Sequence, residues 1–210
     1  MWDFEVLIQL NKHRMNKKIH ILVIILKKNI PMKKIFVTLF FVAVALLTVN
    51  SQSGSVLEVG MKAPAWKFTD ADKNEFTMDS WAGKVLQINY VDPDESDLND
   101  TFNDAVNKAA DKEKRINREF FKGFGIVDCK STWKPTGLVR MIAGKKARKY
   151  GTTILFDYEA ILQNTWGLPR DSYSVVLVDK NRVVRAIYKG KIPETENEKI
   201  IQQIIALTKE

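Results

Sequence analysis

The sequence Val85-Leu86-Gln87-Ile88-Asn89-Tyr90-Val91 establishes what kind of fold this chain adopts. Its length and its branched and aromatic side chains are typical of a buried strand in an α/β sheet. Asp92-Pro93-Asp94-Glu95 follows at once, so the strand ends in an acidic loop. Loops that follow such strands form the edge where α/β sheets bind ligands, so this loop is the first place to look for function.

Strand and helix patterns alternate on both sides of this strand. Extended patterns occur at residues 65–69, 75–78, 123–128, 152–156, 174–178 and 183–188. Helical periodicity occurs at residues 98–110, 136–150 and 193–208. Residues 160–165 fit either a short helix or an extended segment. This order predicts an α/β fold in which helices flank a mixed central sheet.

Residues 32–51 have the anatomy of a secretory signal. Two lysines precede an apolar run at 35–49, and small residues surround a plausible cleavage point after Ser51. The run is shorter than the roughly 20 residues that a membrane-spanning helix needs. We therefore expect a signal peptide at 32–51 and a periplasmic or secreted domain at 52–210; an uncleaved anchor is the alternative. Residues 1–31 are expected to be a non-structural upstream extension, either because translation starts at Met32 or because a basic extension precedes the signal.

The formal charge of +8 comes mostly from the residues before position 52. Residues 52–210 contain 25 lysines and arginines against 23 aspartates and glutamates. This balance is ordinary for a soluble domain and does not steer a polyanion toward it. We therefore expect no nucleic-acid partner, and no stable membrane span once the signal has been cleaved.

The chain contains a single cysteine, Cys129, so it cannot form an internal disulfide. Both histidines, His13 and His20, precede the predicted signal, so no histidine of the exported domain can act as a base. Cys129 is therefore free, bound to a small thiol, or paired with a second chain.

Several short motifs resemble those of peroxiredoxin-like and TlpA-like thioredoxin-fold proteins. The opening of that fold is matched by Gly60, Ala63, Pro64, Phe68 and Asp72, and by Gly83-Lys84-Val85. Its second half is matched by residues 154–157, 166–168 and 176–181. The resemblance covers the chain from Val59 onward and implies a thioredoxin-like domain. In such a sheet, the strand at 123–128 lies beside the strand at 85–91 and parallel to it.

Two departures from this pattern concern the redox site. Asp92, Pro93, Asp94 and Glu95 occupy the loop where working relatives carry the Cys-x-x-Cys pair. Such enzymes place a cis-proline just before the strand that corresponds to residues 174–178. Here that position is occupied by Ser172-Tyr173-Ser174. A chain with both departures resembles the YtfJ-type periplasmic proteins, a thioredoxin-fold group whose biochemical role is not established.

Cys129 is the candidate catalytic residue. It follows the strand at 123–128, so in a thioredoxin-like sheet it emerges at the same edge as the acidic loop. Nearby acids would raise the pKa of its thiol and disfavour the reactive thiolate, whereas three basic residues could offset them. Those three are Lys130, Lys134 and Arg140. The alternative is that Cys129 is a small packing residue.

The other candidates for ligand binding at this edge are Asp92, Asp94, Tyr173 and Trp133. Trp133 is included because it stands in a polar stretch close to Cys129. The acidic loop spaces its oxygens as calcium sites do, but Asp97 stands where a calcium loop needs glycine. We therefore expect an acidic helix cap rather than a metal site, and we expect no cofactor.

The segment at 134–149 is rich in lysine and arginine, and it could meet an acidic partner or lipid headgroups. A solvated helix face is the ordinary explanation for such a charge run. Taken together, the sequence predicts an exported thioredoxin-fold protein without a redox dithiol. We expect a binding or accessory module that meets a protein or a small ligand in the periplasm. The alternative is a thiol oxidoreductase or peroxidase that uses Cys129 alone.

Overall fold

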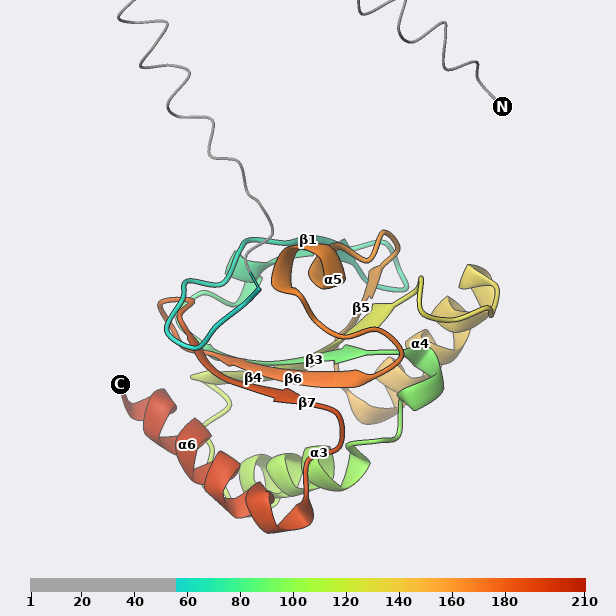
Figure 1. The fold of residues 1–210 in the computed structure, drawn as a ribbon. Helices are drawn as coiled ribbons and strands as arrows, with labels where there is room; N and C mark the ends of the chain where they lie inside the picture. The colour runs from blue at the N-terminus through green and yellow to red at the C-terminus, as the bar shows by residue number, and fades with distance from the viewer. Residues whose placement is uncertain (1–55) are drawn as a thin grey trace, which may run out of the picture. The chain divides into compact units, whose positions relative to one another are not determined.

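A computed structural model describes residues 56–210. They form a seven-stranded sheet in the order β2-β1-β5-β4-β3-β6-β7, with helices on both faces (Figure 1). The predicted extension at 1–31 and the predicted signal at 32–51 lie outside the described residues. In the part of the chain that the structure describes, no helix combines the length and the apolar character needed to cross a bilayer.

The strands are β1 Lys67–Thr69, β2 Glu75–Thr77, β3 Val85–Val91, β4 Phe121–Asp128, β5 Ile154–Asp157, β6 Tyr173–Val178 and β7 Val184–Lys189. The helices are α3 Asp100–Asn107, α4 Thr136–Tyr150, α5 Ile161–Trp166 and α6 Asn197–Lys209. A π-helical turn, Lys108–Lys112, continues α3, and short 3-10 turns occur at Met78–Trp81, Pro93–Glu95 and Glu194–Glu196.

The central strand β3 is fully buried and sets the register of the sheet. It runs parallel to β4, with Val91 beside Val127, and antiparallel to β6, with Val91 opposite Tyr173. The loops after β3, β4 and β5 and the start of β6 therefore meet at one edge. The predicted parallel pairing of the strands at 85–91 and 123–128 is confirmed.

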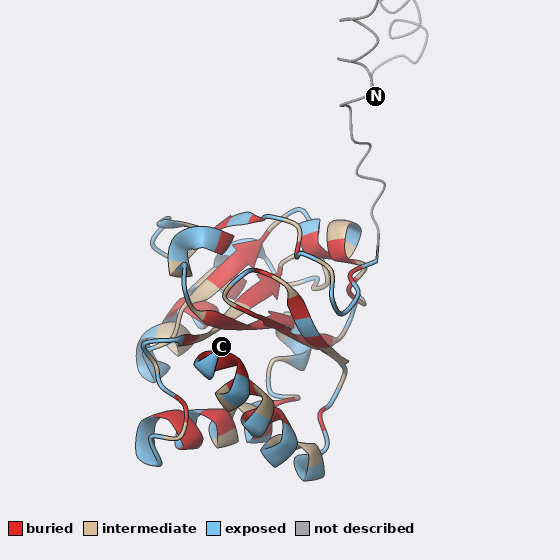
Figure 2. Ribbon diagram, turned by 90° about the vertical axis from the view of Figure 1, so that its left-hand side faces the viewer, coloured by how far each residue is buried: buried red, intermediate tan, exposed pale blue. Residues whose placement is uncertain are grey.

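The side chains of β3 alternate between two apolar cores, as the pleat of a strand requires. Leu86, Ile88 and Tyr90 pack with Trp166 of α5 on one face. Val85 and Val91 pack on the other face, against α3 and α6. Figure 2 shows how burial concentrates in the strands between these two layers of helix.

The predicted elements agree with the structure to within a few residues. The helix at 136–150 is confirmed as α4, and Gly151 ends it in the left-handed conformation, with φ 60°. The strand predicted at 123–128 begins two residues earlier, because Phe121 also pairs with Val85. The ambiguous segment at 160–165 is a helix, α5.

Candidate functional site

The two loops that depart from the redox pattern lie in direct contact at the carboxyl edge. The backbone N–H of Asp92 donates to the carbonyl of Ser172 at 2.9 Å. No peptide bond between residues 56 and 210 is cis, so the segment at 172–174 also lacks the backbone shape that a cis-proline would give. The two loops therefore meet at this edge without a cysteine pair and without a cis peptide bond in residues 56–210.

Asp92 and Asp94 occupy the first of these loops, in different environments. Asp92 is buried, and its carboxylate accepts the backbone N–H of Asp94 at 2.7 Å. Burial, together with the carboxylates of Asp94, Asp171 and Asp128, raises the pKa of Asp92. The Asp94 carboxylate is exposed, and its ion pair with Lys134 lowers its pKa. Asp92 therefore caps the turn at Pro93–Glu95, and Asp94 ties the loop to the start of α4.

Asp128, the last residue of β4, is a buried carboxylate that the sequence analysis did not single out. It accepts hydrogen bonds from the backbone N–H of Lys130 at 2.9 Å and the hydroxyl of Ser131 at 2.6 Å. The side-chain amide of Gln163 on α5 also donates to it. These donors occupy the carboxylate oxygens of Asp128.

Asp157, the last residue of β5, is the second buried carboxylate, and it is fully enclosed. It accepts backbone N–H groups at the start of α5, from Glu159 at 3.2 Å, Ile161 at 2.9 Å and Leu162 at 3.0 Å. The hydroxyl of Tyr90 donates to it at 3.3 Å. Burial, with Asp157 and Asp128 close by, raises the pKa of Tyr90. Asp157 therefore caps α5, and burial with these two carboxylates keeps Tyr90 in its neutral form.

Cys129 lies next to these two carboxylates, at the edge where the sequence placed it. Its backbone N–H donates to the carbonyl of Asp157 at 3.0 Å, and its thiol lies 3.7 Å from the carbonyl of Val127. Burial raises the pKa of Cys129 to about 12, and the charges of Asp128 and Asp157 add to the effect. A raised pKa of the Cys129 thiol is also what the neighbouring acids led us to expect from the sequence. The main cause is burial, and the acids that add to it are the last residues of β4 and β5 rather than residues of the loop after β3.

None of the three basic residues that could offset these acids is engaged with Cys129. Lys130 pairs with Glu159 at 3.1 Å, and Lys134 pairs with Asp94. Arg140 donates through its Nε to the carbonyl of Ala71 at 2.8 Å. The thiolate of Cys129 thus gains no positive partner in the described part of the chain.

The structure separates the remaining candidates. Tyr173 is buried in the core under α3, where its hydroxyl accepts a hydrogen bond from Asn103 at 2.9 Å. Cys129 packs instead in the cluster under α4, so the two are not brought together. Trp133 precedes α4 and is 87 % exposed, which makes it the most accessible of the candidates.

The acidic loop does not gather its oxygens around one point. Asp97 pairs with Lys146 at 3.1 Å, while Asp94 pairs with Lys134. Within residues 56–210, no group of three or more histidine, cysteine, aspartate or glutamate side chains is placed to hold a metal ion. Among the described residues the edge contains no histidine, and its buried carboxylates accept hydrogen bonds from the turns that follow their strands.

Comparison with solved structures supports the fold. The chain is similar to a protein assigned as the thiol:disulfide interchange protein DsbE from Chlorobium tepidum, with a TM-score of 0.55 and 18% identity over 72% of this chain and 99% of that one. It is similar to the thioredoxin domain of a thiol-disulfide oxidoreductase from Bacteroides vulgatus, with a TM-score of 0.53 and 12% identity over 70% and 99% of the two chains. A thiol peroxidase from Chromobacterium violaceum matches with a TM-score of 0.50 and 15% identity over 71% and 89%.

No curated protein matches the chain. Residues 56–210, which include every described strand and helix, match the family described as "Bacterial protein of unknown function (YtfJ_HI0045)". The chain therefore belongs to the YtfJ_HI0045 family and has a thioredoxin-like fold.

Proposed function

We propose that this protein is an exported binding module that uses the thioredoxin fold without thiol–disulfide exchange. The observation that carries the proposal is the environment of Cys129, the single cysteine of the chain. Its thiol is partly buried beside Asp128 and Asp157, and its pKa is raised to about 12. A thiol with that pKa is almost wholly protonated at neutral pH, and the protonated form is a poor nucleophile.

The export part of the proposal rests on the sequence of residues 32–51. A basic start, an apolar run of signal length and a small-residue cleavage point occur there in the order that secretory signals require. In the periplasm, a domain with one partly buried cysteine has no internal disulfide to form and no partner thiol of its own.

The surface best suited to binding a partner is the outer face of α4 with Trp133. Leu138, Met141 and Ile142 lie three and four residues apart, so they share one face of the helix, and each is at least 40% exposed. We call these three side chains and Trp133 the α4 patch. Adjacent exposed apolar side chains of this size mark interaction sites more often than isolated ones do.

Charge identifies the kind of partner that the α4 patch fits. Helix α4 carries five lysines and arginines and no acidic residue. Lys145 stands one turn beyond Met141, and Lys149 stands one turn beyond Lys145, on the same face and exposed. We infer a protein partner whose surface places acidic residues beside an apolar centre, since such a surface complements both features.

A capture experiment with matched variants tests this proposal. The exported protein is immobilised, and proteins retained from a periplasmic extract are identified for Trp133→Ala, Ile142→Asp and Cys129→Ser. The control is Ile161→Asp, because Ile161 is also partly exposed but lies on α5, away from the α4 patch. We expect one acidic partner to be lost with the first two variants and kept with Cys129→Ser and the control. Loss of that partner with Cys129→Ser alone would contradict the proposal.

The competing function is a single-cysteine thiol enzyme. Thiol peroxidases share this fold, as the protein from Chromobacterium violaceum illustrates. Peroxide consumption by the purified protein that disappears in Cys129→Ser would support this second function and overturn the first.

A further inference from the structure

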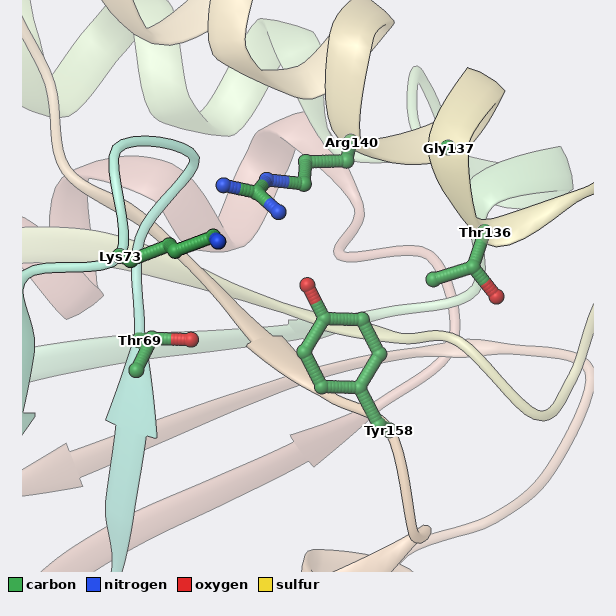
Figure 3. Close-up of a pocket in the computed structure, with 6 residues that line it drawn as sticks. All are labelled: Thr69, Lys73, Thr136, Gly137, Arg140 and Tyr158. Carbon is green, nitrogen blue, oxygen red and sulfur yellow. The ribbon is translucent and has the colours of Figure 1, made fainter.

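A hollow of about 440 Å³ lies beside the carboxyl edge, where three segments distant in the sequence meet (Figure 3). It is lined by Thr69, Lys73, Thr136, Gly137, Arg140 and Tyr158. Its volume falls within the range of small-molecule sites in proteins. We propose that this hollow binds the oxyanion of a small organic molecule, a carboxylate or a phosphate.

The first cation of the hollow is Lys73, which is held by a rigid turn. The carboxylate of Asp70 accepts the backbone N–H groups of Asp72 and Asn74, both at 2.9 Å, and the side-chain amide of Asn74 at 3.0 Å. Lys73 itself has φ 69°, a left-handed conformation that residues other than glycine adopt rarely. Among residues 56–210, its ammonium group has no ion-pair partner. The turn therefore fixes the backbone from which the Lys73 side chain reaches the hollow.

The second cation is Arg140, and its guanidinium is also fixed. Its Nε and Nη2 both donate to the carbonyl of Ala71 in the same turn. Its Nη1 has no hydrogen-bond partner in the described part of the chain. Figure 3 shows the nitrogen atoms of Arg140 and Lys73 and the hydroxyl of Tyr158 pointing toward one another. Asp70 of the turn offsets part of the charge of Arg140, and an anion between Arg140 and Lys73 would reduce the remaining repulsion between the two cations.

The neutral groups of the hollow suit an oxyanion as well. The hydroxyl of Tyr158 makes no hydrogen bond within residues 56–210, and burial raises its pKa, so it remains a donor at neutral pH. The hydroxyl of Thr69 lies across from it (Figure 3). None of the six lining residues is acidic. The ring of Tyr158 adds an apolar wall, which favours an anion borne on an apolar body over a free ion.

The hollow depends on a close approach between α4 and the turn that carries Lys73. A Cβ atom placed on Gly144 would lie 2.9 Å from the Cβ of Ala71, closer than real side chains come. Because residue 144 is glycine, the turn that carries Lys73 can pack against α4. This close packing brings the carbonyl of Ala71 within reach of Arg140. The site uses a different side of α4 from the α4 patch, so it is independent of the proposed protein partner.

The experiment is an NMR titration of the ¹⁵N-labelled protein purified after export. The probes are inorganic phosphate, phenylacetate and 2-phenylethanol, the last being an uncharged match for phenylacetate. We expect a saturable shift of the Gly137 amide with phosphate, phenylacetate or both, and none with 2-phenylethanol. A response to one probe alone identifies phosphate or carboxylate as the preferred class.

Variants connect the shift to the two cations. Lys73→Gln is expected to weaken binding about tenfold, as is Arg140→Gln, since each loses a charge-assisted hydrogen bond. Lys73 is exposed, so its replacement should leave the fold unchanged even if Arg140→Gln disturbs the turn. Lys191→Gln, which replaces an exposed lysine between β7 and α6, outside both the hollow and the α4 patch, is the control and should bind like the wild type. The proposal is overturned if neither anion causes a saturable shift, if 2-phenylethanol binds equally well, or if Lys73→Gln binds as the wild type does.

Discussion

Asp128 and Asp157 stand opposite each other in the register of β4 and β5, and both carboxylates are buried. Cys129 follows Asp128 directly and is bonded through its backbone N–H to the carbonyl of Asp157. A thiolate formed at Cys129 would be a third negative charge in a partly desolvated place. Relatives that exchange disulfides need the opposite arrangement, in which the surroundings stabilise a thiolate.

Removing one of these charges should therefore make Cys129 more acidic. In Asp128→Asn, we expect the pKa of Cys129 to fall below the wild-type value of about 12 while burial keeps it above that of a free cysteine. The rate of alkylation by iodoacetamide at pH 9 should rise several-fold. Asp94→Asn is the control, because Lys134 already compensates Asp94. An unchanged rate in Asp128→Asn, or a rate that simply follows global unfolding in low urea, would refute the electrostatic explanation.

Asp92 should destabilise the folded protein at neutral pH. Its folded-state pKa is raised above the ordinary 3.8, chiefly by burial, so the ionised form is disfavoured on folding. The penalty is absent well below pH 3.8, where Asp92 is protonated in both states, and it grows as the pH rises through the folded-state pKa. We expect Asp92→Asn to raise the free energy of unfolding at pH 7 and to leave it unchanged at pH 3. Urea unfolding at pH 3 and pH 7 measures these free energies. A variant less stable than the wild type at pH 7 would contradict the prediction.

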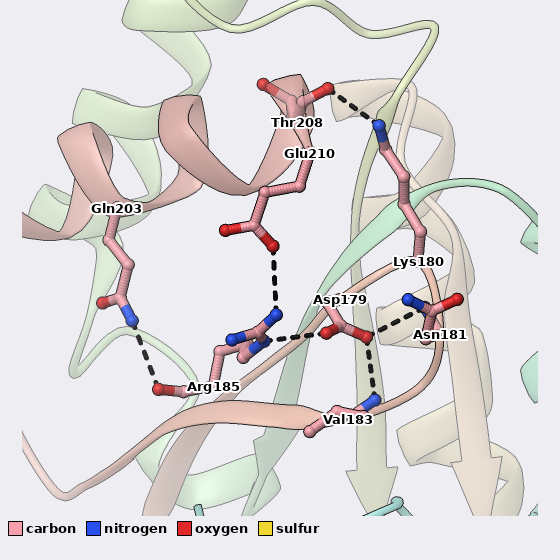
Figure 4. Close-up of polar contacts among 8 residues, drawn as sticks. All are labelled: Asp179, Lys180, Asn181, Val183, Arg185, Gln203, Thr208 and Glu210. Carbon is pink, nitrogen blue, oxygen red and sulfur yellow. Dashed lines mark hydrogen bonds and ion pairs between the residues drawn. The ribbon is translucent and has the colours of Figure 1, made fainter. Parts of the chain in front are cut away.

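Asp179, in the turn between β6 and β7, should behave in the opposite way (Figure 4). Burial opposes its ionisation, but the backbone N–H of Val183 and the side chain of Arg185 lower its pKa below the ordinary 3.8. This stabilisation is present above pH 3.8 and is lost as the pH falls through the folded-state pKa. Asp179→Asn should cost about 1–2 kcal/mol at pH 7, and the difference from wild type should shrink toward pH 3. If the free energies of unfolding of Asp179→Asn and the wild type differed by the same amount at every pH in this range, the charge of Asp179 would not be the cause.

Two glycines of α4 provide a matched pair for the packing argument. Alanine is a better helix former than glycine by about 1 kcal/mol, so an unhindered replacement should stabilise the protein. Gly137 has nothing within 4 Å of the missing Cβ, and Gly137→Ala should gain up to that amount. Gly144→Ala meets Ala71 and should instead lose about 1 kcal/mol net, because overpacking costs more than the helix gains. Thermal and urea unfolding compare the two, and equal gains would show that α4 does not press against the turn.

The fold could be predicted from the sequence because the patterns that identify its strands and helices are local. The apolar run at 85–91 predicted β3 without error, and the helical period up to Gly151 predicted α4. The ordering of these elements then matched a thioredoxin-like frame. The π-helical turn Lys108–Lys112 was not foreseen, since its residues continue the periodicity of α3.

The sequence was less informative about the site, because the important contacts are long-range. Asp128 and Asp157 each end an apolar strand, and from sequence alone an acid in that position indicates only a turn. Their burial follows from the packing of α5 over the sheet edge, which no local pattern encodes. The hollow beside Lys73 joins residues from the turn after β1, the start of α4 and the end of β5, so only the structure brings them together.

The central claim is that Cys129 is not an activated thiol. The rate of its alkylation in the native protein, measured from pH 6 to pH 10, tests this claim most directly. We predict very slow labelling that still rises at pH 10, with roughly a thousandfold less thiolate than a free cysteine would show at neutral pH. Labelling in concentrated urea should be fast and should show the pKa of an ordinary thiol. Rapid native labelling that levels off below pH 8 would mean that Cys129 is activated, and a binding role without thiol chemistry would then be wrong.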